Sequence, residues 1–282
     1  MTDTVDAVFE VVADAAAEIR SGLAERRAYA DAKNPSGERQ LAAEVHADEL
    51  LEERLLALDG VAGYASEERA HVTHAEGGGY NVACDPLDGS SNLESNNGMG
   101  TIVAVYDDQL PAGGDALVAA GYVLYGPVTT MVTAREGTAT EWLLAGGQRQ
   151  ELEADVTLPQ DPLVYGFGGR IPDWTDAFRE FVDEVETDRL KLRYGGAMVA
   201  DVNQVLTYGG IFGYPMLKGS PEGKLRLQFE GHPIAAIIEA AGGASSNGEQ
   251  SLLSCVPSAL HERSPVFVGT ESIVDDLEER LS

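Results

Sequence analysis

Apolar residues near the N-terminus recur with the spacing of an α-helix. Between residues 5 and 29 one face collects the side chains of Val8, Val11, Val12, Ala15 and Ile19. The turn-forming run Asn34-Pro35-Ser36-Gly37 interrupts this pattern. A second amphipathic pattern follows over residues 40–58. The chain is therefore predicted to begin with two amphipathic helices, over 5–29 and 40–58.

Short apolar runs bounded by glycine, proline or polar residues then replace the helical pattern. Runs of this length are typical of buried strands. The predicted strands cover residues 61–65, 80–84, 100–106, 116–125 and 128–133. The last two are expected to form a β pair through the turn at Gly126-Pro127.

A polar stretch over 147–161 separates this first unit from a second one in which strands and helices alternate. Strands are predicted at 163–166, 190–194, around Ile211 and at 266–269, and helices at 173–185, 197–206, 233–241 and the acidic C-terminus. Alternation in both halves predicts a layered α/β protein with two domains, residues 1–155 and 156–282.

Charge limits the partners that this chain can bind. It carries 47 Asp and Glu residues against 19 Lys and Arg, of which four are lysine, for a net charge of −28. No basic face can be assembled to displace phosphate counterions, so we expect neither nucleic acid nor an anionic membrane surface as a partner. The acidity has two explanations, which are cation binding and a solvated shell suited to a very salty cytoplasm. The even scatter of the acids favours the second.

The other bulk features indicate a cytoplasmic protein. No run of about 18 apolar residues is present, which argues against a membrane span. The acidic N-terminus does not resemble a signal peptide. Cys84 and Cys255 are too few for a disulfide framework and suggest a reducing compartment.

Acidic residues lie at the ends of two predicted strands. Glu67 and Glu68 follow the strand at 61–65, and Asp85 and Asp88 follow the strand at 80–84. Within one sheet these carboxylates would repel one another unless cations intervene. Hard oxygen ligands without histidine or cysteine favour Mg2+ or Mn2+ over zinc.

The residues after Asp88 predict an anion site. Gly89 permits close backbone approach, and Ser90 and Ser91 at a helix start would direct N–H groups at a phosphate. Alone, Asp-x-x-Asp-Gly is common in ordinary turns, and Ser-Glu-Glu is typical of a solvated turn or helix start. A calcium loop fails on spacing, and no GxxxxGK[ST] sequence is present.

Longer motifs are more specific. The run DPLDGSSN at 85–92, with Ser66-Glu67-Glu68 upstream, resembles the lithium-sensitive phosphatase superfamily, which includes inositol monophosphatases and fructose-1,6-bisphosphatases. Segments 192–202, 208–215, 223–230 and 260–265 are similar to class I fructose-1,6-bisphosphatases. This resemblance implies an α-β-α-β-α sandwich of mixed sheets.

The resemblance also implies a role for particular residues. The metal ligands would be Glu67, Asp85, Asp88, Glu230 and the Leu87 carbonyl, for two or three Mg2+ ions. Glu68 would activate water. Glu44 and Glu38, which both align more loosely and stand where relatives have aspartate, would lie on a mobile segment. Substrate contacts would come from Gly89, Ser90, Ser91, Arg193, Tyr194, Met198, Tyr214, Lys224 and Arg226, with Arg193 reaching into a neighbouring subunit of a homotetramer or at least a homodimer. Lys224 and Arg226 would lie on one face of a strand.

The activity that this resemblance implies is Mg2+-dependent removal of the 1-phosphate of fructose 1,6-bisphosphate, as in gluconeogenesis. Inositol monophosphate and sedoheptulose 1,7-bisphosphate are alternative substrates, and a non-catalytic cation-binding or scaffold protein is an alternative of another class. One departure from the family lies near residues 165–170, where its phosphate-binding asparagine is missing.

Overall fold

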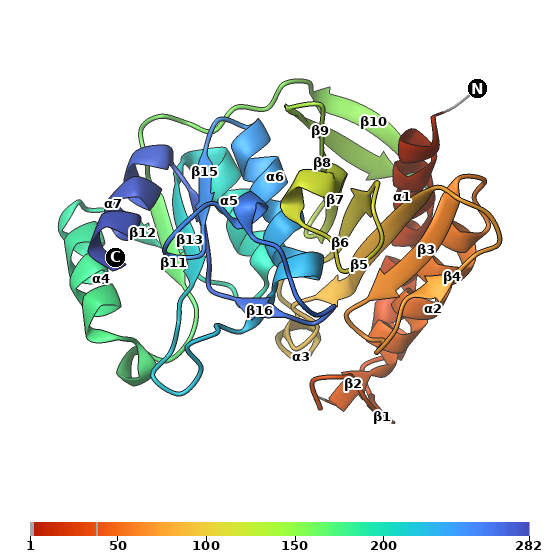
Figure 1. Ribbon diagram of the computed structural model, residues 1–282, viewed down its shortest axis with the longest axis horizontal. Helices are drawn as coiled ribbons and strands as arrows, with labels where there is room; N and C mark the ends of the chain where they lie inside the picture. Colours follow the sequence, from red (N-terminus) through yellow and green to blue (C-terminus); the bar gives the residue numbers. More distant parts are fainter. Residues whose placement is uncertain (1–2, 38, 282) are drawn as a thin grey trace.

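Two helices pack side by side at the N-terminal end of the molecule (Figure 1). The computed structural model describes residues 3–37 and 39–281, and in it α1 spans Thr4–Gly22 and α2 spans Ala42–Leu56. The first predicted helix is thus too long, because the chain leaves α1 at Gly22, a poor helix former, for the 3-10 turn Leu23–Glu25. A small hairpin, β1 (Tyr29–Lys33) and β2 (Arg39–Leu41), then leads into α2.

An eight-stranded mixed sheet lies against these helices, in the order β10-β9-β8-β7-β6-β5-β3-β4. Only β3 and β5 pair in parallel. The strands are β3 (Val61–Ser66), β4 (Thr73–His74), β5 (Tyr80–Asp88), β6 (Met99–Tyr106), β7 (Leu117–Tyr125), β8 (Thr129–Arg135), β9 (Thr138–Ala145) and β10 (Gln148–Glu153). The short helix α3 (Asn92–Ser95) and the 3-10 turn Gly114–Ala116 lie in its connections.

A five-stranded mixed sheet forms the second half, in the order β12-β11-β13-β17-β15. Its strands are β11 (Val164–Phe167), β12 (Lys191–Leu192), β13 (Gly210–Tyr214), β15 (Ala244–Ser246) and β17 (Val266–Gly269). A separate pair joins β14 (Leu225–Arg226) to β16 (Arg263–Ser264). The helices are α4 (Asp176–Thr187), α5 (Met198–Tyr208), the π-helix Leu227–Gly231, α6 (His232–Ala240) and α7 (Glu271–Leu281), with 3-10 turns at Ile171–Asp173 and Leu252–Ser254.

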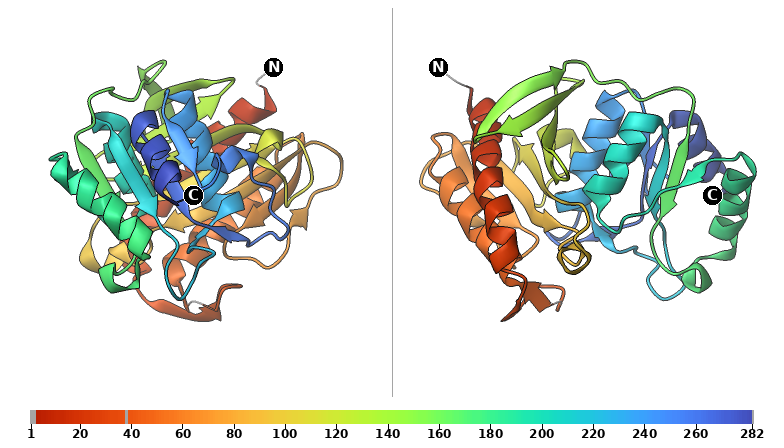
Figure 2. Two further views of the ribbon diagram at one scale, coloured as in Figure 1. Left: turned by 60° about the vertical axis from the view of Figure 1, so that its left-hand side comes forward. Right: turned by 180° about the vertical axis from the view of Figure 1, so that it is seen from behind.

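Hydrophobic contacts stack these elements into five layers, as Figures 1 and 2 show. Helices α5 and α6 lie between the sheets, since Val202 and Ile237 share one buried cluster with Tyr122 of the first sheet and Phe212 of the second. Helices α4 and α7 cover the outer face of the second sheet through a cluster rich in phenylalanine. The predicted α-β-α-β-α sandwich is confirmed.

The sheet edge formed by β9 and β10 and a π-helix also differ from the pattern-based prediction. Strands β9 and β10 were not predicted, because most of their side chains are only partly buried or exposed and the alternation is weak. The π-helix Leu227–Gly231 was not predicted either, although it carries an acidic residue into the core. Across the described residues, no helix combines the length and the apolar character needed to cross a membrane.

Candidate active site

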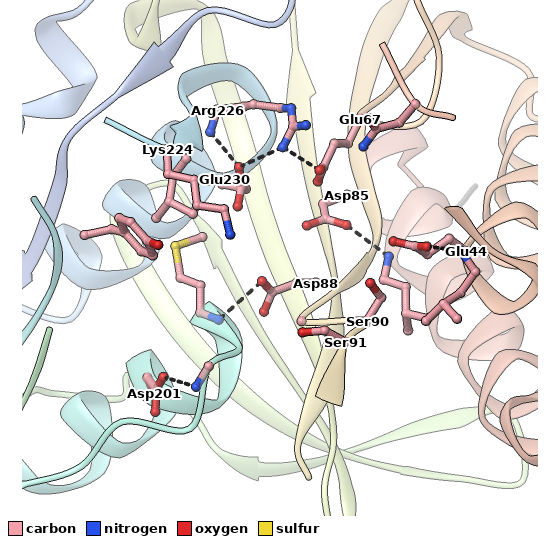
Figure 3. A pocket seen from close by; sticks show the side chains of 18 of the residues that line it. Glu44, Glu67, Asp85, Asp88, Ser90, Ser91, Asp201, Lys224, Arg226 and Glu230 are labelled. Atoms are coloured by element: carbon pink, nitrogen blue, oxygen red, sulfur yellow. Dashed lines mark hydrogen bonds and ion pairs between the residues drawn. The ribbon is translucent and has the colours of Figure 1, made fainter. Parts of the chain in front are cut away.

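Three carboxylates from distant parts of the chain converge at one edge of the first sheet (Figure 3). Strands β3 and β5 are parallel with Ser66 opposite Cys84, so Glu67 and Asp85 follow at the same edge. The π-helix brings in Glu230, and one oxygen from each of the three carboxylates lies within 4.8 Å of the others. π-helical turns are rare and often occur at functional sites.

Burial and like charge make this cluster electrostatically costly. Desolvation, followed by the charges of Glu67, Asp88 and Glu230, raises the pKa of Asp85 well above its ordinary value. Desolvation and then the charge of Glu67 raise the pKa of Glu230 to about 8. Among the described residues, the cation that enters the cluster is Arg226, whose Nη1 lies 2.5 Å from Glu67 Oε1 and whose backbone N–H donates to Glu230 Oε2 at 2.5 Å.

Asp88 lies beside the cluster and joins it to the second half of the chain. Its two carboxylate oxygens accept hydrogen bonds from the backbone N–H groups of Met198 (3.2 Å) and Val199 (2.8 Å), at the start of α5. The positive end of the helix dipole favours an anion there. Desolvation nevertheless prevails and raises the pKa of Asp88 to about 7. Asp88 is therefore both a potential metal ligand and a helix-terminal acceptor.

The donor set fits a hard divalent cation. It consists of carboxylate oxygens alone, which Mg2+ and Mn2+ prefer, and no histidine or cysteine belongs to the converging group. A cation would offset the repulsion that raises the pKa values of Asp85 and Glu230. The geometry of this part of the chain can thus hold a metal ion.

Two further glutamates flank the cluster. Glu68 follows Glu67, and its Oε2 accepts a hydrogen bond of 2.5 Å from Gln40 Nε2. Desolvation, then the charges of Glu44 and Glu67, raise the pKa of Glu68 to about 8. Glu44 closes the first turn of α2 by accepting from the backbone N–H of Leu41. Glu38, which the sequence also suggested, lies outside the described residues.

A cavity of about 320 Å3 opens beside these groups. Of the site residues expected from the sequence, sixteen are described, and fourteen of these line the cavity, namely Glu44, Glu67, Asp85, Leu87, Asp88, Gly89, Ser90, Ser91, Tyr194, Met198, Tyr214, Lys224, Arg226 and Glu230. The other two, Glu68 and Arg193, are not part of its wall. Sequence reasoning therefore brought together residues that share one cavity.

Residues 89–91 contribute backbone as well as side chains to this cavity. Gly89 has a φ of 71°, and a Cβ there would lie 2.2 Å from the Cβ of Ala197, so glycine allows the loop to approach the start of α5. Among the described residues, the N–H groups of Ser90 and Ser91 have no hydrogen-bond acceptor. They remain available to an anion in the cavity. The helix that follows, α3, is only one turn long, and Ser91 does not cap it through its side chain.

Lys224 and Arg226, two cations of the second half of the chain, do not lie side by side on a strand as expected. Lys224 and Arg226 were expected on one face of a strand, but β14 contains only Leu225 and Arg226. Arg226 is buried against Glu67, whereas the Lys224 ammonium lies 5.6 Å from the centre of the Tyr214 ring. Burial of so many carboxylates requires a counter-charge, which explains why Arg226 turns inward.

Tyr194 and Arg193 follow β12 at the edge of the second sheet. Tyr194 lines the cavity, and desolvation raises its pKa to about 12. Arg193 is exposed and donates to the backbone carbonyl of Leu192 at 3.1 Å. Arg193 is not among the residues that line the cavity of its own chain.

Sequence reasoning missed several cavity residues. Tyr29, Asn34 and Arg39 line it from the hairpin before α2, and the Arg39 guanidinium stacks 4.8 Å from the centre of the Tyr29 ring. One signal for Arg39 is available in the sequence. Cations are uncommon in this acidic chain, and Arg39 lies close to the Asn-Pro-Ser-Gly turn. Asp201 also lines the cavity and accepts from the N–H groups of Gly195 (2.6 Å) and Gly196 (3.2 Å), which fixes the loop before α5.

Comparisons with known proteins agree with this geometry. Residues 4–148 match the family model of the fructose-1,6-bisphosphatase N-terminal domain, and residues 158–282 match that of its C-terminal domain. The chain is 62% identical to a class 1 fructose-1,6-bisphosphatase of Natronomonas pharaonis over 283 aligned residues, which cover 100% of both chains. A relative of the same name from Halobacterium salinarum is 59% identical, with 100% of this chain and 98% of the relative covered.

A solved structure extends the agreement to three dimensions. The crystal structure of Leishmania major fructose-1,6-bisphosphatase in holo form superposes with a TM-score of 0.92 at 28% sequence identity, covering 99% of this chain and 94% of the other. Both family models and full-length identity above 60% point the same way. The chain therefore belongs to the class 1 fructose-1,6-bisphosphatases, a family of phosphoric monoester hydrolases.

Proposed function

We propose that this protein hydrolyses the 1-phosphate of fructose 1,6-bisphosphate to give fructose 6-phosphate and phosphate. The observation that carries the proposal is the meeting, in one cavity, of a buried carboxylate cluster with the N–H groups of Ser90 and Ser91, which have no acceptor in the described part of the chain. Carboxylates alone would repel a phosphate ester. A carboxylate cluster that holds cations, next to backbone donors, can bind one.

The proposed metal ligands are Glu67, Asp85, Asp88, Glu230 and the Leu87 carbonyl, and the proposed ions are two or three Mg2+, with Mn2+ as a substitute. When bound, such ions neutralise phosphate charge and promote ionisation of water. The protein side chains do the rest. Arg226, buried against Glu67, holds that carboxylate toward Glu230.

Each remaining group has a role in the proposed reaction. The N–H groups of Ser90 and Ser91 bind the oxygens of the phosphate that is removed. In-line attack by water forms a new P–O bond while the P–O bond to the sugar breaks, and the leaving sugar oxygen takes up a proton from solvent to become the C1 hydroxyl. The Glu68 carboxylate, with Glu44 nearby, accepts the proton of the attacking water. Lys224, Tyr194 and Tyr214 line the same cavity and hold the 6-phosphate, while Met198 packs against the sugar.

A phosphate-release assay in magnesium tests this assignment. Fructose 1,6-bisphosphate should be turned over with a kcat/KM about 10²-fold higher than fructose 1-phosphate, because the latter lacks the charge-assisted hydrogen bonds to Lys224 and its neighbours. Inositol monophosphate should be similarly poor. Equal turnover of all monophosphates would contradict a bisphosphate site, and faster release from sedoheptulose 1,7-bisphosphate would shift the assignment to that sugar. No release from any of them would favour a non-catalytic cation-binding protein.

Arg39 supplies a second prediction. Among the described residues its guanidinium pairs with no carboxylate and rests on the Tyr29 ring at the cavity wall. We expect it to attract the anionic substrate, so Arg39→Gln should raise KM about tenfold and leave kcat nearly unchanged. Arg26→Gln is the matched control, because Arg26 lies outside the cavity and donates to the Gly22 carbonyl. An unchanged KM in Arg39→Gln would refute the role.

The assembly and location are part of the same proposal. Leu192 is 61% exposed and Tyr194 45% exposed, beside the exposed Arg193, which supports a neighbouring subunit at this edge and hence a homotetramer or at least a homodimer. We place the domain boundary at 155/156, between β10 and β11. Cys84 is a buried free thiol, which is consistent with a reducing cytoplasm.

A further inference from the structure

Arg69 follows Glu67 and Glu68, and it makes more contacts than the turn after β3 needs. After β3 the backbone is fixed by three hydrogen bonds, from Glu67 N–H to the Cys84 carbonyl (3.0 Å), from Glu68 N–H to Ser66 Oγ (3.1 Å) and from Arg69 N–H to the Ser66 carbonyl (3.1 Å). These bonds shape the turn itself. They do not fix its position relative to the other segments that supply carboxylates.

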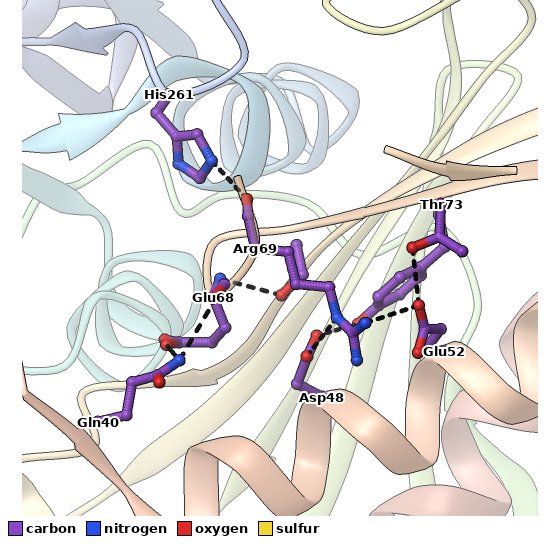
Figure 4. A network of polar contacts seen from close by, with 9 residues as sticks. Gln40, Asp48, Glu52, Glu68, Arg69, Thr73 and His261 are labelled. Atoms are coloured by element: carbon purple, nitrogen blue, oxygen red, sulfur yellow. Dashed lines mark hydrogen bonds and ion pairs between the residues drawn. The ribbon is translucent and has the colours of Figure 1, made fainter. Parts of the chain in front are cut away.

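The Arg69 side chain makes that connection on one side (Figure 4). Its Nε donates to Asp48 Oδ2 at 2.6 Å and its Nη1 to Glu52 Oε1 at 2.8 Å, both on α2. Asp48 is buried and also accepts from the Tyr64 hydroxyl at 3.1 Å. Asp48 lies four residues after Glu44 and so shares its helix face. Arg69 thereby ties the turn that carries Glu67 and Glu68 to the helix that carries Glu44.

The Arg69 backbone makes a second connection, to the other half of the chain. Its carbonyl accepts a hydrogen bond of 2.7 Å from His261 Nε2, which therefore carries the proton. His261 is adjacent to Glu262, whose carbonyl accepts from the N–H of Leu227 at 2.9 Å, at the start of the π-helix that carries Glu230. One residue thus joins three segments, each of which brings a carboxylate to the site.

We propose that Arg69 is a positioning residue that sets the separation between the Glu67-Glu68 turn, α2 and the Glu230 segment. The proposal rests on the function proposed above, in which these carboxylates hold cations and move a proton. A fixed separation matters there because misplacement by about 1 Å can cost about 10²-fold in rate. The directional fork of the guanidinium suits this task, since it addresses two carboxylates at once.

The chain offers a matched control in Arg54. It also makes a forked contact, with Asp14 (2.8 Å) and Glu18 (2.5 Å) of α1, and its side chain is 30% exposed, against 29% for Arg69. Both arginines therefore join α2 to a neighbouring element at similar exposure. Only Arg69 adjoins the carboxylate cluster, so a general loss of packing should affect both variants alike.

The experiment compares Arg69→Met, Arg54→Met and the double variant Asp48→Asn with Arg69→Met, in steady-state phosphate release and in thermal unfolding with and without Mg2+. Arg69→Met should lower kcat about 10- to 100-fold with KM within twofold, and should raise severalfold the Mg2+ concentration needed for half of the thermal shift. Arg54→Met should keep kcat within twofold. In the double variant, which leaves no buried charge unpaired, the unfolding temperature should recover while kcat should stay low.

Three results would overturn the positioning role: a kcat loss below twofold in Arg69→Met, an equal loss in Arg54→Met, or recovery of kcat together with stability in the double variant. Arg69→Lys, which keeps the charge without the fork, should regain stability but less than a third of the lost rate. The Mg2+ thermal shift separates this proposal from the proposed function. A wild-type protein that releases no phosphate refutes the function, whereas the shift still reports whether Arg69 orders the carboxylates.

Discussion

Asp85→Asn should abolish most of the activity and at the same time stabilise the metal-free protein. We expect kcat to fall by about 10²- to 10³-fold or more, the scale seen when one group that stabilises transition-state charge is removed. The fold should persist, because the asparagine Oδ1 can still accept the hydrogen bond of 3.0 Å that Leu87 N–H donates to Asp85 Oδ1. Circular dichroism and phosphate release measured on the same preparation check both halves of this prediction.

The stabilisation follows from the sign of the pKa shift. Burial and neighbouring acids hold the pKa of Asp85 in the folded, metal-free chain well above its unfolded value. Folding at pH 7 therefore requires either proton uptake or an ionised group among like charges, and asparagine avoids both. The variant should unfold at a higher temperature in EDTA at pH 7, by about 2–4 °C for each kcal/mol gained. This gain should shrink as the pH falls through about 4, the pKa of an unfolded aspartate, and should vanish near pH 3, where Asp85 is protonated in both states. A variant less stable than its parent at pH 7 would contradict the clustered geometry.

Local sequence was sufficient to place the first half of the site. Glu67 and Asp85 each follow a short apolar run, and two parallel strands in one sheet end at the same edge. The register shift between Asp85 and Asp88 then accommodates Pro86 and carries the chain toward α5. These features depend on residues close together in the sequence, so their pattern is readable without coordinates.

The positions of Glu230 and Arg226 could not be predicted from local sequence patterns. Glu230 lies on a π-helix within an apolar segment, and only the resemblance to a family connected it to Asp85, 145 positions earlier. Arg226 was expected to contact phosphate, and that remains a prediction. Its contact with Glu67 depends on how much charge folding buries at one point, which no local window of sequence reports.

Tyr29 and Arg39 were missed for a related reason. They belong to short strands on either side of a turn, and their stacking is created by the hairpin rather than by any motif. The predicted helix over 5–29 concealed this hairpin, because Ala24, Ala28 and the neighbouring charged residues are acceptable in a helix. Tertiary pairing of β1 with β2 determined the outcome.

Magnesium should stabilise this protein well beyond what ionic strength alone provides. A net charge of −28 means that any salt screens repulsion between surface acids and raises the unfolding temperature. The informative quantity is therefore the difference between the unfolding temperatures measured in MgCl2 and in KCl at equal ionic strength. A cation bound among Glu67, Asp85 and Glu230 contributes to stability by mass action, about 2.7 kcal/mol at 100 times its dissociation constant.

This contribution should appear as an additional rise of about 5–10 °C in the unfolding temperature, saturating with MgCl2. Screening, in contrast, should continue to rise through molar KCl, because it acts on acids spread over the whole surface. In Asp85→Asn, most of the rise in unfolding temperature that saturates with MgCl2 should be lost, whereas the rise caused by screening should remain. Glu279→Gln, which removes an exposed acid from α7, should keep both. If MgCl2 and KCl at equal ionic strength gave the same curve, or if Asp85→Asn retained the full shift, the carboxylates that meet between β3, β5 and the π-helix would not be a cation site, and the phosphatase chemistry derived from them would fail with it.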